Sequence, residues 1–440
     1  MAPTATNGHV NGGPALNMQG VPTPLPKTLA VSGDSNGLEK LGLRDLDASL
    51  LTTTLVPESD LKPIPDTKDL VFGQTKTEHM LTCSFDPQTG WGTPEIKPYG
   101  PFHLDPMSSC FQYCPTVFEG MKAYIDPSGE ARLFRPELNM QRMQRSLARV
   151  ALPPINTEAL LSLVKALVRV ERRWIPRTKG CSLYIRPTVI GTRASLGVSA
   201  SDHALLYIIV SPTGPYFPTG PKPVSLLGIH EHARAWPGGT GGFKLGLNYA
   251  PGFMPQRIAA QKGYQQVLWL LNDADKDGVE DNHLKNLRIT EAGAMNFFAV
   301  RKRDDGDLDV VTPPLDGTIL PGVTRQSCIE LLSAHGSRTV LPGLSPETKL
   351  HVEERTLTIA ELVQWNEEGR LAEAFCVGTA VIVAPVGRIG YTFSTASGET
   401  TKDLVFPPYE AHGPVGNALF ERIIDIQEGR EEWQGWSVPC

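Results

Sequence analysis

The stretch Trp236-Pro-Gly-Gly-Thr-Gly-Gly-Phe-Lys-Leu-Gly-Leu-Asn-Tyr249 is the most distinctive in the chain. Five glycines fall within nine residues, and Lys244 lies among them between Phe243 and Leu245. A P-loop requires Gly directly before its Lys and Ser or Thr after it, so these neighbours exclude that motif. An amine kept among apolar side chains can form a Schiff base with an aldehyde cofactor. A surface loop with a solvated Lys244 is the alternative that this stretch alone leaves open.

Two turns further along the chain are candidate phosphate sites. Gly322-Val-Thr-Arg325 precedes a segment with the apolar periodicity of a helix, and Gly378-Thr-Ala380 lies between two expected strands. Each can offer backbone N–H groups and a Thr hydroxyl to a phosphate, and a helix N-terminus strengthens the first. An ordinary turn explains either segment about as well.

The segment Tyr184-Ile-Arg186-Pro-Thr188 places Tyr184, Arg186 and Thr188 on one face of an expected strand. An Arg in an otherwise apolar strand needs an anionic partner, which is either a structural carboxylate or a substrate carboxylate. The sequence Asp273-x-Asp275-x-Asp277-Gly278 begins like a calcium loop, but Leu284 stands where a bidentate Glu is required. We interpret it as a solvated hairpin tip and expect no metal site.

Composition excludes several classes of protein. The 41 basic and 47 acidic residues give a net charge of −6, which argues against nucleic-acid and membrane partners. Seven scattered cysteines without a Cys-x-x-Cys pair indicate free thiols in a reducing compartment. No apolar run is long enough for a membrane helix, and the N-terminus lacks a secretory pattern. We expect a cytoplasmic protein; a mitochondrial location stays open.

The 42 Gly and 38 Pro make about 18% of the chain, which predicts many loops. Residues 1–65 contain no aromatic residue and are predicted to form a mostly disordered arm, with 41–51 docking locally. A smaller α/β domain is expected over 66–210 and a larger one over 224–440. The Pro- and Gly-rich segment 211–223 is the expected linker between them.

Hydrophobic periodicity predicts a mixed α/β chain. A helix is expected from Pro136, and another after Asn156 as its N-cap. Further helices are expected at 324–333 and 414–426, and strands at 182–190, 204–210, 265–271, 295–300, 308–311, 374–377 and 381–383.

These motifs together resemble the branched-chain amino acid aminotransferases, which are pyridoxal phosphate enzymes of fold type IV. The resemblance covers roughly residues 70–432 and leaves the N-terminal arm aside. It rests on Phe118-Glu-Gly-Met-Lys-Ala-Tyr124, Arg132-Leu-Phe-Arg-Pro136 with Asn139-Met-Gln-Arg142, Ser182-Leu-Tyr-Ile-Arg-Pro-Thr188, Arg234-Ala-Trp236, Lys244, Asn248-Tyr249, Ile289-Thr-Glu-Ala-Gly293 and Pro314-Leu-Asp-Gly-Thr-Ile-Leu-Pro-Gly-Val-Thr-Arg325.

The resemblance implies a role for each matching residue around the pyridoxal 5'-phosphate. Lys244 would be the Schiff-base lysine and would move the proton at the substrate Cα. Glu291 would face the pyridine nitrogen, and Tyr249 the phenolic oxygen. The phosphate would be held by Arg142, Val323, Thr324 and Thr379, with Arg234 supporting the same end of the cofactor.

The resemblance also implies a homodimer and a substrate pocket. Its apolar pocket would be formed by Tyr113, Phe118, Tyr184 and Ala380, while Leu196 and Val198 would reach across from a second subunit. Arg186 would orient 2-oxoglutarate. Two positions depart from the family pattern: Lys76 stands where an aromatic residue usually lines the pocket, and Ala294 replaces a Thr.

The expected activity is a ping-pong transfer of an amino group between leucine, isoleucine or valine and 2-oxoglutarate, as in branched-chain amino-acid biosynthesis. Because Lys76 and Ala294 fall in the expected pocket, a specialised aminotransferase for another amino or keto acid is the main alternative. A D-amino acid aminotransferase, an aminodeoxychorismate lyase and a non-catalytic binding protein of the same fold are further alternatives.

Overall fold

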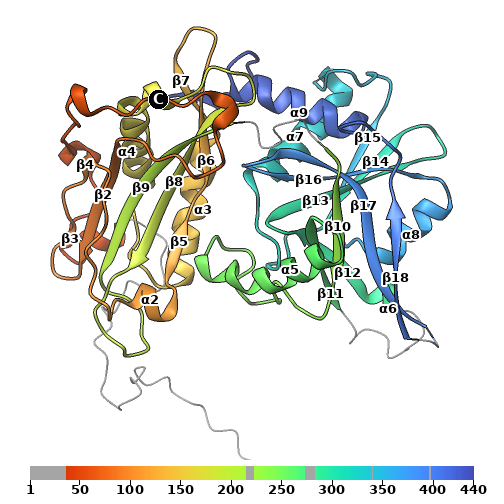
Figure 1. Cartoon of the computed structure of the whole chain (residues 1–440), viewed down its shortest axis with the longest axis horizontal. Coiled ribbons are helices and arrows are strands. Elements are labelled where there is room, and N and C mark those ends of the chain that lie inside the picture. Colours follow the sequence, from red (N-terminus) through yellow and green to blue (C-terminus); the bar gives the residue numbers. More distant parts are fainter. Residues whose placement is uncertain (1–35, 215–221, 273–282, 339, 396–397) are drawn as a thin grey trace, which may run out of the picture.

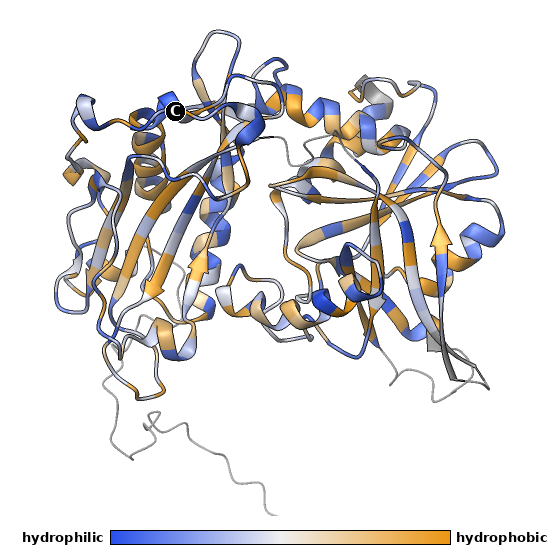
Figure 2. Ribbon diagram, in the orientation of Figure 1, coloured by the Kyte–Doolittle hydropathy of each residue, from blue (hydrophilic) through white to orange (hydrophobic). Residues whose placement is uncertain are grey.

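The computed structural model of the chain describes residues 36–214, 222–272, 283–338, 340–395 and 398–440. Their strands form one sheet of ten strands and another of nine, which lie in the two halves of the molecule (Figure 1). Hydrophobic residues concentrate in the strands and in the helix faces turned toward them (Figure 2). The mixed α/β architecture expected from the sequence is confirmed.

The first sheet is built mainly from the N-terminal half of the chain. Its strand order is β1 (Thr52–Thr53), β4 (Glu95–Pro98), β2 (His79–Asp86), β9 (Ala204–Thr213), β8 (Ser182–Gly191), β6 (Met121–Ile125), β7 (Ala131–Phe134) and β19 (Ser437–Pro439). β3 (Gly90–Trp91) pairs with β2, and β5 (Thr116–Phe118) with β8. This half also contains α1 (Asn36–Glu39), α2 (Ser109–Tyr113), α3 (Pro136–Arg149), α4 (Thr157–Val170) and short 3-10 helices at Ala48–Leu50, Glu58–Asp60, Thr67–Asp69 and Arg172–Trp174.

Helices α3 and α4 cover one face of this sheet, and local sequence signals explain where they begin. Pro136 occupies the first turn of α3, where its missing N–H leaves no bond unmade. Asn156 caps α4, because its Oδ1 accepts the N–H groups of Glu158 at 3.1 Å and Ala159 at 2.9 Å. Both predicted helix starts are confirmed. The apolar stripes of the helices join the strands in one hydrophobic core.

Residues 36–65 pack on this sheet, which corrects the expectation of a disordered arm for that part of 1–65. Leu38 and Leu46 are 0% and 2% exposed within the first core. Leu43, Ala48 and Leu51 pack against this core, as expected for 41–51, and hydrogen bonds attach the chain again at Val56 and Lys62. Residues 1–35 lie outside the described part of the chain.

Buried polar side chains fix this segment where apolar residues are few. The backbone N–H of Val56 donates to Nε2 of His79 at 2.9 Å. That of Lys62 donates to Oε1 of Glu78 at 2.9 Å. Because both acceptors are buried, these bonds hold the segment against β2.

The second sheet comes from the C-terminal half. Its strand order is β12 (Leu287–Ala292), β11 (Gln266–Asn272), β10 (Val224–Ile229), β17 (Ile382–Thr395), β16 (Leu371–Gly378), β13 (Met295–Lys302), β14 (Leu308–Thr312) and β15 (Leu350–Glu354). β18 (Gly398–Val405) pairs with β17, and β12 also pairs with β13. The β12–β13 pairing closes a ring of six strands, which are β12, β11, β10, β17, β16 and β13. This half also contains α5 (Phe253–Gln261), α6 (His283–Asn286), α7 (Val323–Arg338), α8 (Ile359–Glu367), α9 (Pro414–Gln427) and 3-10 helices at Gly246–Asn248 and Ala250–Gly252.

The end of the chain returns to the first half of the molecule. The last strand, β19, therefore does not belong to the second sheet, although it falls within the domain expected at 224–440. β19 pairs antiparallel with β7, with Val438 opposite Leu133. Cys440 packs against the first core, and Figure 1 shows the C-terminus beside the first sheet. Of the expected linker at 211–223, the first three residues complete β9, and 215–221 lie outside the described residues.

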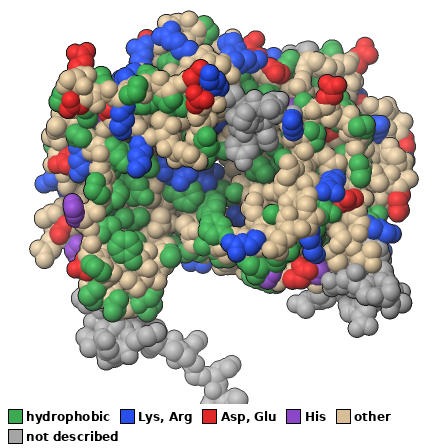
Figure 3. Space-filling view, in the orientation of Figure 1, with side chains coloured by type: hydrophobic (Ala, Val, Ile, Leu, Met, Phe, Trp, Pro, Cys, Tyr) green, Lys and Arg blue, Asp and Glu red, His purple; other side chains and the backbone are tan. Residues whose placement is uncertain are grey.

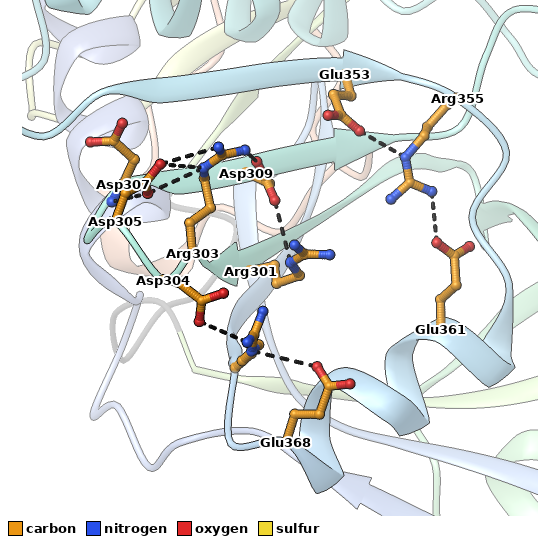
Figure 4. A network of polar contacts seen from close by, with 11 residues as sticks. Arg301, Arg303, Asp304, Asp305, Asp307, Asp309, Glu353, Arg355, Glu361 and Glu368 are labelled. Atoms are coloured by element: carbon orange, nitrogen blue, oxygen red, sulfur yellow. Dashed lines mark hydrogen bonds and ion pairs between the residues drawn. The ribbon is translucent and has the colours of Figure 1, made fainter.

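A network of ion pairs holds the β13–β14 hairpin (Figure 4). Arg303 pairs with Asp305 at 3.1 Å and with Asp309 at 3.0 Å. Arg301 contacts the same Asp309 at 3.3 Å. The network is an internal brace of this hairpin.

The acidic tip beginning at Asp273 lies outside the described residues, so its expected conformation stays a prediction. Within the described ranges, no helix is both long and apolar enough to cross a bilayer. The same ranges contain no group of three His, Cys, Asp or Glu side chains placed to hold a metal ion.

Candidate active site

A cavity of about 520 Å³ lies between the two halves of the molecule. Figure 3 shows this face hollowed there, with hydrophobic side chains gathered along the hollow. Both halves supply its walls, which consist of Phe72, Phe118, Gly120, Tyr184, Arg186, Lys244, Gly246, Tyr249, Phe253, Gln266, Ala294, Met295, Gly378, Thr379, Ala380 and Val381.

Lys244 lines this cavity and supplies its amine. Its Nζ donates to the hydroxyl of Tyr249 at 3.1 Å and lies 4.8 Å from the ring centre of Phe118. The glycines around it allow close backbone approach: a Cβ on Gly241 would lie 2.5 Å from the carbonyl oxygen of Thr318. The backbone of Lys244 is also anchored, because its carbonyl accepts the N–H of Phe118 at 3.2 Å. The structure therefore holds this amine in the cavity, not in a solvated surface loop.

Glu291 lies in β12 behind this wall and is 1% exposed. One carboxylate oxygen pairs with Arg234 at 2.9 Å, and the other accepts the N–H of Leu320 at 2.6 Å. Burial raises the pKa of Glu291, while Arg234 and the Leu320 N–H act in the opposite direction. Arg234 itself is fixed to the loop before α7, since it donates to the carbonyl of Thr318 at 3.1 Å.

The two candidate phosphate turns meet in space. Val323, Thr324 and Thr379 line one small cavity of about 20 Å³, although more than fifty residues of chain separate the two turns. Val323 and Thr324 begin α7, whose first N–H groups have no partner within the helix. The hydroxyl of Thr379 donates to the carbonyl of Gly120 at 3.4 Å, which joins the second turn to the first half of the molecule.

Arg142 lies behind these turns and does not line either cavity. It donates to both carboxylate oxygens of Glu119 at 2.7 Å and to the carbonyl of Pro321 at 3.0 Å. Asn139 donates to the same carboxylate at 2.9 Å. Glu119, which is fully buried, was not among the residues predicted from the sequence. The sequence feature that could have pointed to Glu119 is its place in Phe118-Glu-Gly, where a carboxylate directly follows a pocket residue.

Phe72 lines the cavity and Lys76 does not, which corrects the pocket position expected for Lys76. The ring of Phe72 packs edge-on against Tyr184 with centroids 4.8 Å apart. Lys76 is exposed, and its Nζ lies over the ring of Tyr99 at 5.6 Å, outside the residues that line the cavity.

Arg186 brings a cation to this otherwise aromatic wall. Its guanidinium carbon lies 4.7 Å from the ring centre of Phe118, and Nη2 donates to the hydroxyl of Tyr184 at 3.1 Å. Its Nε is buried and has no hydrogen-bond partner among the described residues. Arg186 thus brings a cationic group to the cavity wall.

Tyr113 does not line the cavity, contrary to its expected place beside Phe118, Tyr184 and Ala380. It is 41% exposed, and its hydroxyl donates to the carbonyl of Leu196. Leu196 and Val198 are 57% and 55% exposed. Tyr113 therefore shares a surface with the two residues expected to reach toward a second subunit.

Ala294 lines the cavity, as expected from its position after Gly293. Gly293 has φ +57°, and a Cβ there would lie 2.4 Å from the side chain of Gln266. This close approach brings the Gln266 carboxamide to the cavity wall beside the Ala294 methyl group.

The family described as amino-transferase class IV matches residues 116–389, which include nearly all of these positions. The chain belongs to that family. Two relatives of this class IV aminotransferase share its length closely. The mitochondrial branched-chain-amino-acid aminotransferase of Schizosaccharomyces pombe is 42% identical over 399 residues, covering 91% of this chain and 87% of that protein. The cytosolic one of Saccharomyces cerevisiae is 43% identical over 396 residues, covering 90% and 98%.

This aminotransferase therefore belongs with the branched-chain-amino-acid aminotransferases, as its motifs indicated. Its fold is also that of a solved member, the branched-chain amino acid aminotransferase of Thermobaculum terrenum in its pyridoxal phosphate form. The two structures have a TM-score of 0.59 at 21% identity, covering 83% of this chain and 99% of the other.

Proposed function

We propose that this enzyme transfers the amino group between leucine, isoleucine or valine and 2-oxoglutarate, with pyridoxal 5'-phosphate as its cofactor. The observation that carries the proposal is the Lys244 amine, 3.1 Å from the Tyr249 hydroxyl in a cavity with aromatic walls. The curated relatives described above bear the name of this activity.

The residues present fit pyridoxal phosphate. Lys244 supplies the amine that an aldehyde requires. The first N–H groups of α7 and the hydroxyls of Thr324 and Thr379 supply donors for a phosphate, and they line one small cavity. Arg142 supports this end of the site through its bond to Pro321, next to the first turn.

When bound, the cofactor supplies an aldehyde that links to amines and a ring that accepts the electron pair released at the substrate Cα. Lys244 moves the proton at that Cα, because its Nζ is the amine that lines the cavity. The Tyr249 hydroxyl orients the amine by accepting its hydrogen bond, and it is the group we place beside the phenolic oxygen of the cofactor.

Glu291 is the carboxylate that we place against the pyridine nitrogen, where it keeps that nitrogen protonated. Its burial would favour the neutral acid, but the Arg234 guanidinium and the Leu320 N–H both stabilise the carboxylate. Arg234 thus maintains the charge that this role requires.

The substrates are recognised by the aromatic wall and by Arg186. Phe72, Phe118 and Tyr184 offer apolar surface to a branched side chain. The Arg186 guanidinium lines the cavity and can pair with the second carboxylate of 2-oxoglutarate, which a branched-chain substrate lacks.

A homodimer completes the site in this proposal. The exposed Tyr113, Leu196 and Val198 form a surface that a second copy of the chain would cover, and they would contribute to that copy's pocket. Analytical ultracentrifugation tests the dimer, and exchange of inactive subunits carrying Lys244→Ala and Leu196→Asp tests the shared pocket. Restored activity in the mixed dimer is expected; a fully active monomer would contradict the dimer.

A specialised aminotransferase is the second candidate, and Ala294 favours it. A methyl group at this position of the wall makes no hydrogen bond to a substrate and leaves more room than a larger side chain. A panel of amino donors with 2-oxoglutarate separates the two candidates. Turnover led by leucine, isoleucine and valine supports the first; negligible turnover of all three together with rapid use of another donor supports the second.

We place the enzyme in the cytosol. All seven cysteines are free in the structure, as a reducing compartment requires. The relatives described above include one named cytosolic and one named mitochondrial. Fractionation of cells that express the chain tests the location, and recovery in the mitochondrial matrix would contradict it.

A further inference from the structure

Lys122 is a buried cation that the reaction described above does not use. It lies in β6 of the first sheet, opposite Tyr184 of β8, and is 7% exposed. Its Nζ donates to the carbonyl of Ala380 at 2.9 Å. Among the described residues this is its one hydrogen bond, and no carboxylate lies within ion-pair distance.

A buried ammonium without a counter-ion is costly to the fold. Burial accordingly lowers the pKa of Lys122 to about 8, and Cys181 acts in the opposite direction. A lysine has three N–H donors, of which Ala380 takes one. The side chain therefore has donors and charge to offer to an anion.

The space beside Lys122 is the small cavity between the two phosphate turns. Val323, Thr324 and Thr379 line it together with Lys122. Its volume of about 20 Å³ holds roughly one water molecule, so a phosphate would lie against its Thr379 wall, which also lines the large cavity. Among the residues that line it, Lys122 carries the one charge and Tyr124 is the other titratable group. The donors that face this space are thus a cation, a helix N-terminus and two hydroxyls.

The contact with Ala380 also controls the shape of the site. Ala380 follows Thr379 in the turn between β16 and β17, so Lys122 holds this turn from the opposite half of the molecule. Ala380 and Thr379 also line the large cavity. One side chain therefore links the phosphate end of the site to its substrate end.

We propose that Lys122 is a positioning residue that fixes the Gly378-Thr-Ala380 turn through the Ala380 carbonyl and directs its remaining charge toward a bound phosphate monoester dianion. This inference rests on the proposed function, since it requires the phosphate to occupy the two turns. It assigns Lys122 to the recognition of the phosphate and leaves the proton transfer to Lys244.

The test uses ligands that cannot bond covalently to Lys244. The affinity of the full-length apoenzyme is measured for 4'-deoxypyridoxine 5'-phosphate and for 4'-deoxypyridoxine, which lacks the phosphate. The variants are Lys122→Met, which removes the charge, and Lys122→Arg, which keeps it. Ser182→Ala is the matched control, because Ser182 is buried on the neighbouring strand β8, bonds to Thr213 at 3.0 Å and lines neither cavity.

We expect Lys122→Met to weaken the phosphorylated ligand at least tenfold, about the effect of one charge-assisted hydrogen bond. Binding of the phosphate-free ligand should stay within twofold of the original protein. Lys122→Arg should restore most of the lost affinity, and Ser182→Ala should bind both ligands as the original protein does. Equal weakening of both ligands by Lys122→Met, or no weakening, would overturn the proposal.

The pH dependence of the unaltered protein provides a second measurement if Lys122→Met does not fold. Because the lysine must be charged to attract the phosphate, affinity for the phosphorylated ligand should fall as the pH rises from 7 to 9. A parallel fall for the phosphate-free ligand would overturn the proposal, as would a flat profile. Failure to bind either ligand would instead contradict the proposed function itself.

Discussion

Arg142 and Glu119 form a buried, two-pronged ion pair in which both hydrogen bonds measure 2.7 Å. Burial opposes the charge of Arg142, but the Glu119 carboxylate outweighs it and raises the pKa of the guanidinium. The third contact of Arg142 is the carbonyl of Pro321, directly before the first phosphate turn. The pair thus connects α3 to the loop that begins the phosphate site.

Glu119→Gln should destabilise the protein by about 3 kcal/mol, because it leaves the buried Arg142 charge without its partner. Urea unfolding of the variant measures this loss. A double-mutant cycle with Arg142→Met separates the pair from its surroundings: the double variant should lose clearly less stability than the sum of the single variants. Additivity within about 0.5 kcal/mol would show that the pair has no coupling energy.

Phe72→Ala should raise the KM for leucine about fivefold to tenfold, because the variant loses apolar surface that contacts the substrate side chain. Lys76→Ala is the matched control from the same segment, and it should change KM less than twofold, since Lys76 lies over Tyr99 outside the cavity. Steady-state kinetics with leucine, isoleucine and valine check both. If Lys76→Ala raised KM more than Phe72→Ala did, Lys76 would line the pocket as the sequence led us to expect.

Leu46→Ala should lower the free energy of unfolding by about 2–4 kcal/mol, because Leu46 is 2% exposed in the first core. Leu55→Ala, in the same segment but 58% exposed, should change it by less than about 0.5 kcal/mol. Chemical denaturation compares the two. Equal, small effects would mean that residues 36–65 do not contribute to the core in solution.

Glu373 predicts a pH dependence of stability. Its carboxylate accepts the N–H groups of Val415 at 2.8 Å and Gly416 at 3.1 Å where α9 begins, and burial raises its pKa to about 7. The folded protein thus retains a proton that the unfolded chain releases near the ordinary pKa of 4.5. Its contribution is fully present below pH 4.5 and is lost as the pH rises through 7.

Urea unfolding between pH 4.5 and 8 tests this dependence. The free energy of unfolding should decline with pH more in the original protein than in Glu373→Gln, by up to about 3 kcal/mol over the window. Parallel pH profiles would show that Glu373 has the same pKa in both states. The Gln amide cannot accept both N–H groups, so Glu373→Gln also changes the stability at every pH. The two proteins are therefore compared by the slope of the free energy of unfolding against pH.

Elements with strong local signals could be predicted from the sequence. Pro136 and Asn156 mark the starts of α3 and α4 because a first-turn proline and an N-cap act within one turn. The glycine stretch drew attention to Lys244 and excluded a P-loop, but the Schiff-base role of Lys244 came from the family resemblance. The meeting of the Gly322 and Gly378 turns came only from the family resemblance, since turns so far apart in sequence have no local signal that joins them.

The features that were missed depend on long-range contacts. β19 pairs with β7 across three hundred residues, which no periodicity reveals. Tyr113 ends the short helix α2, and its hydroxyl bonds to the carbonyl of Leu196, a contact across 83 residues that has no local signal in the sequence. Residues 36–65 are poor in aromatic residues, yet buried acceptors such as His79 and Glu78 hold them to the sheet.

Reduction with borohydride tests the central claim most directly. The purified protein is saturated with pyridoxal 5'-phosphate, reduced and digested, and the modified peptide is identified by mass spectrometry. The account predicts a single phosphopyridoxyl group fixed on Nζ of Lys244. The Lys244→Ala variant should lose both this group and the transamination of leucine. A phosphopyridoxyl group on another lysine, or full activity in Lys244→Ala, would contradict the account.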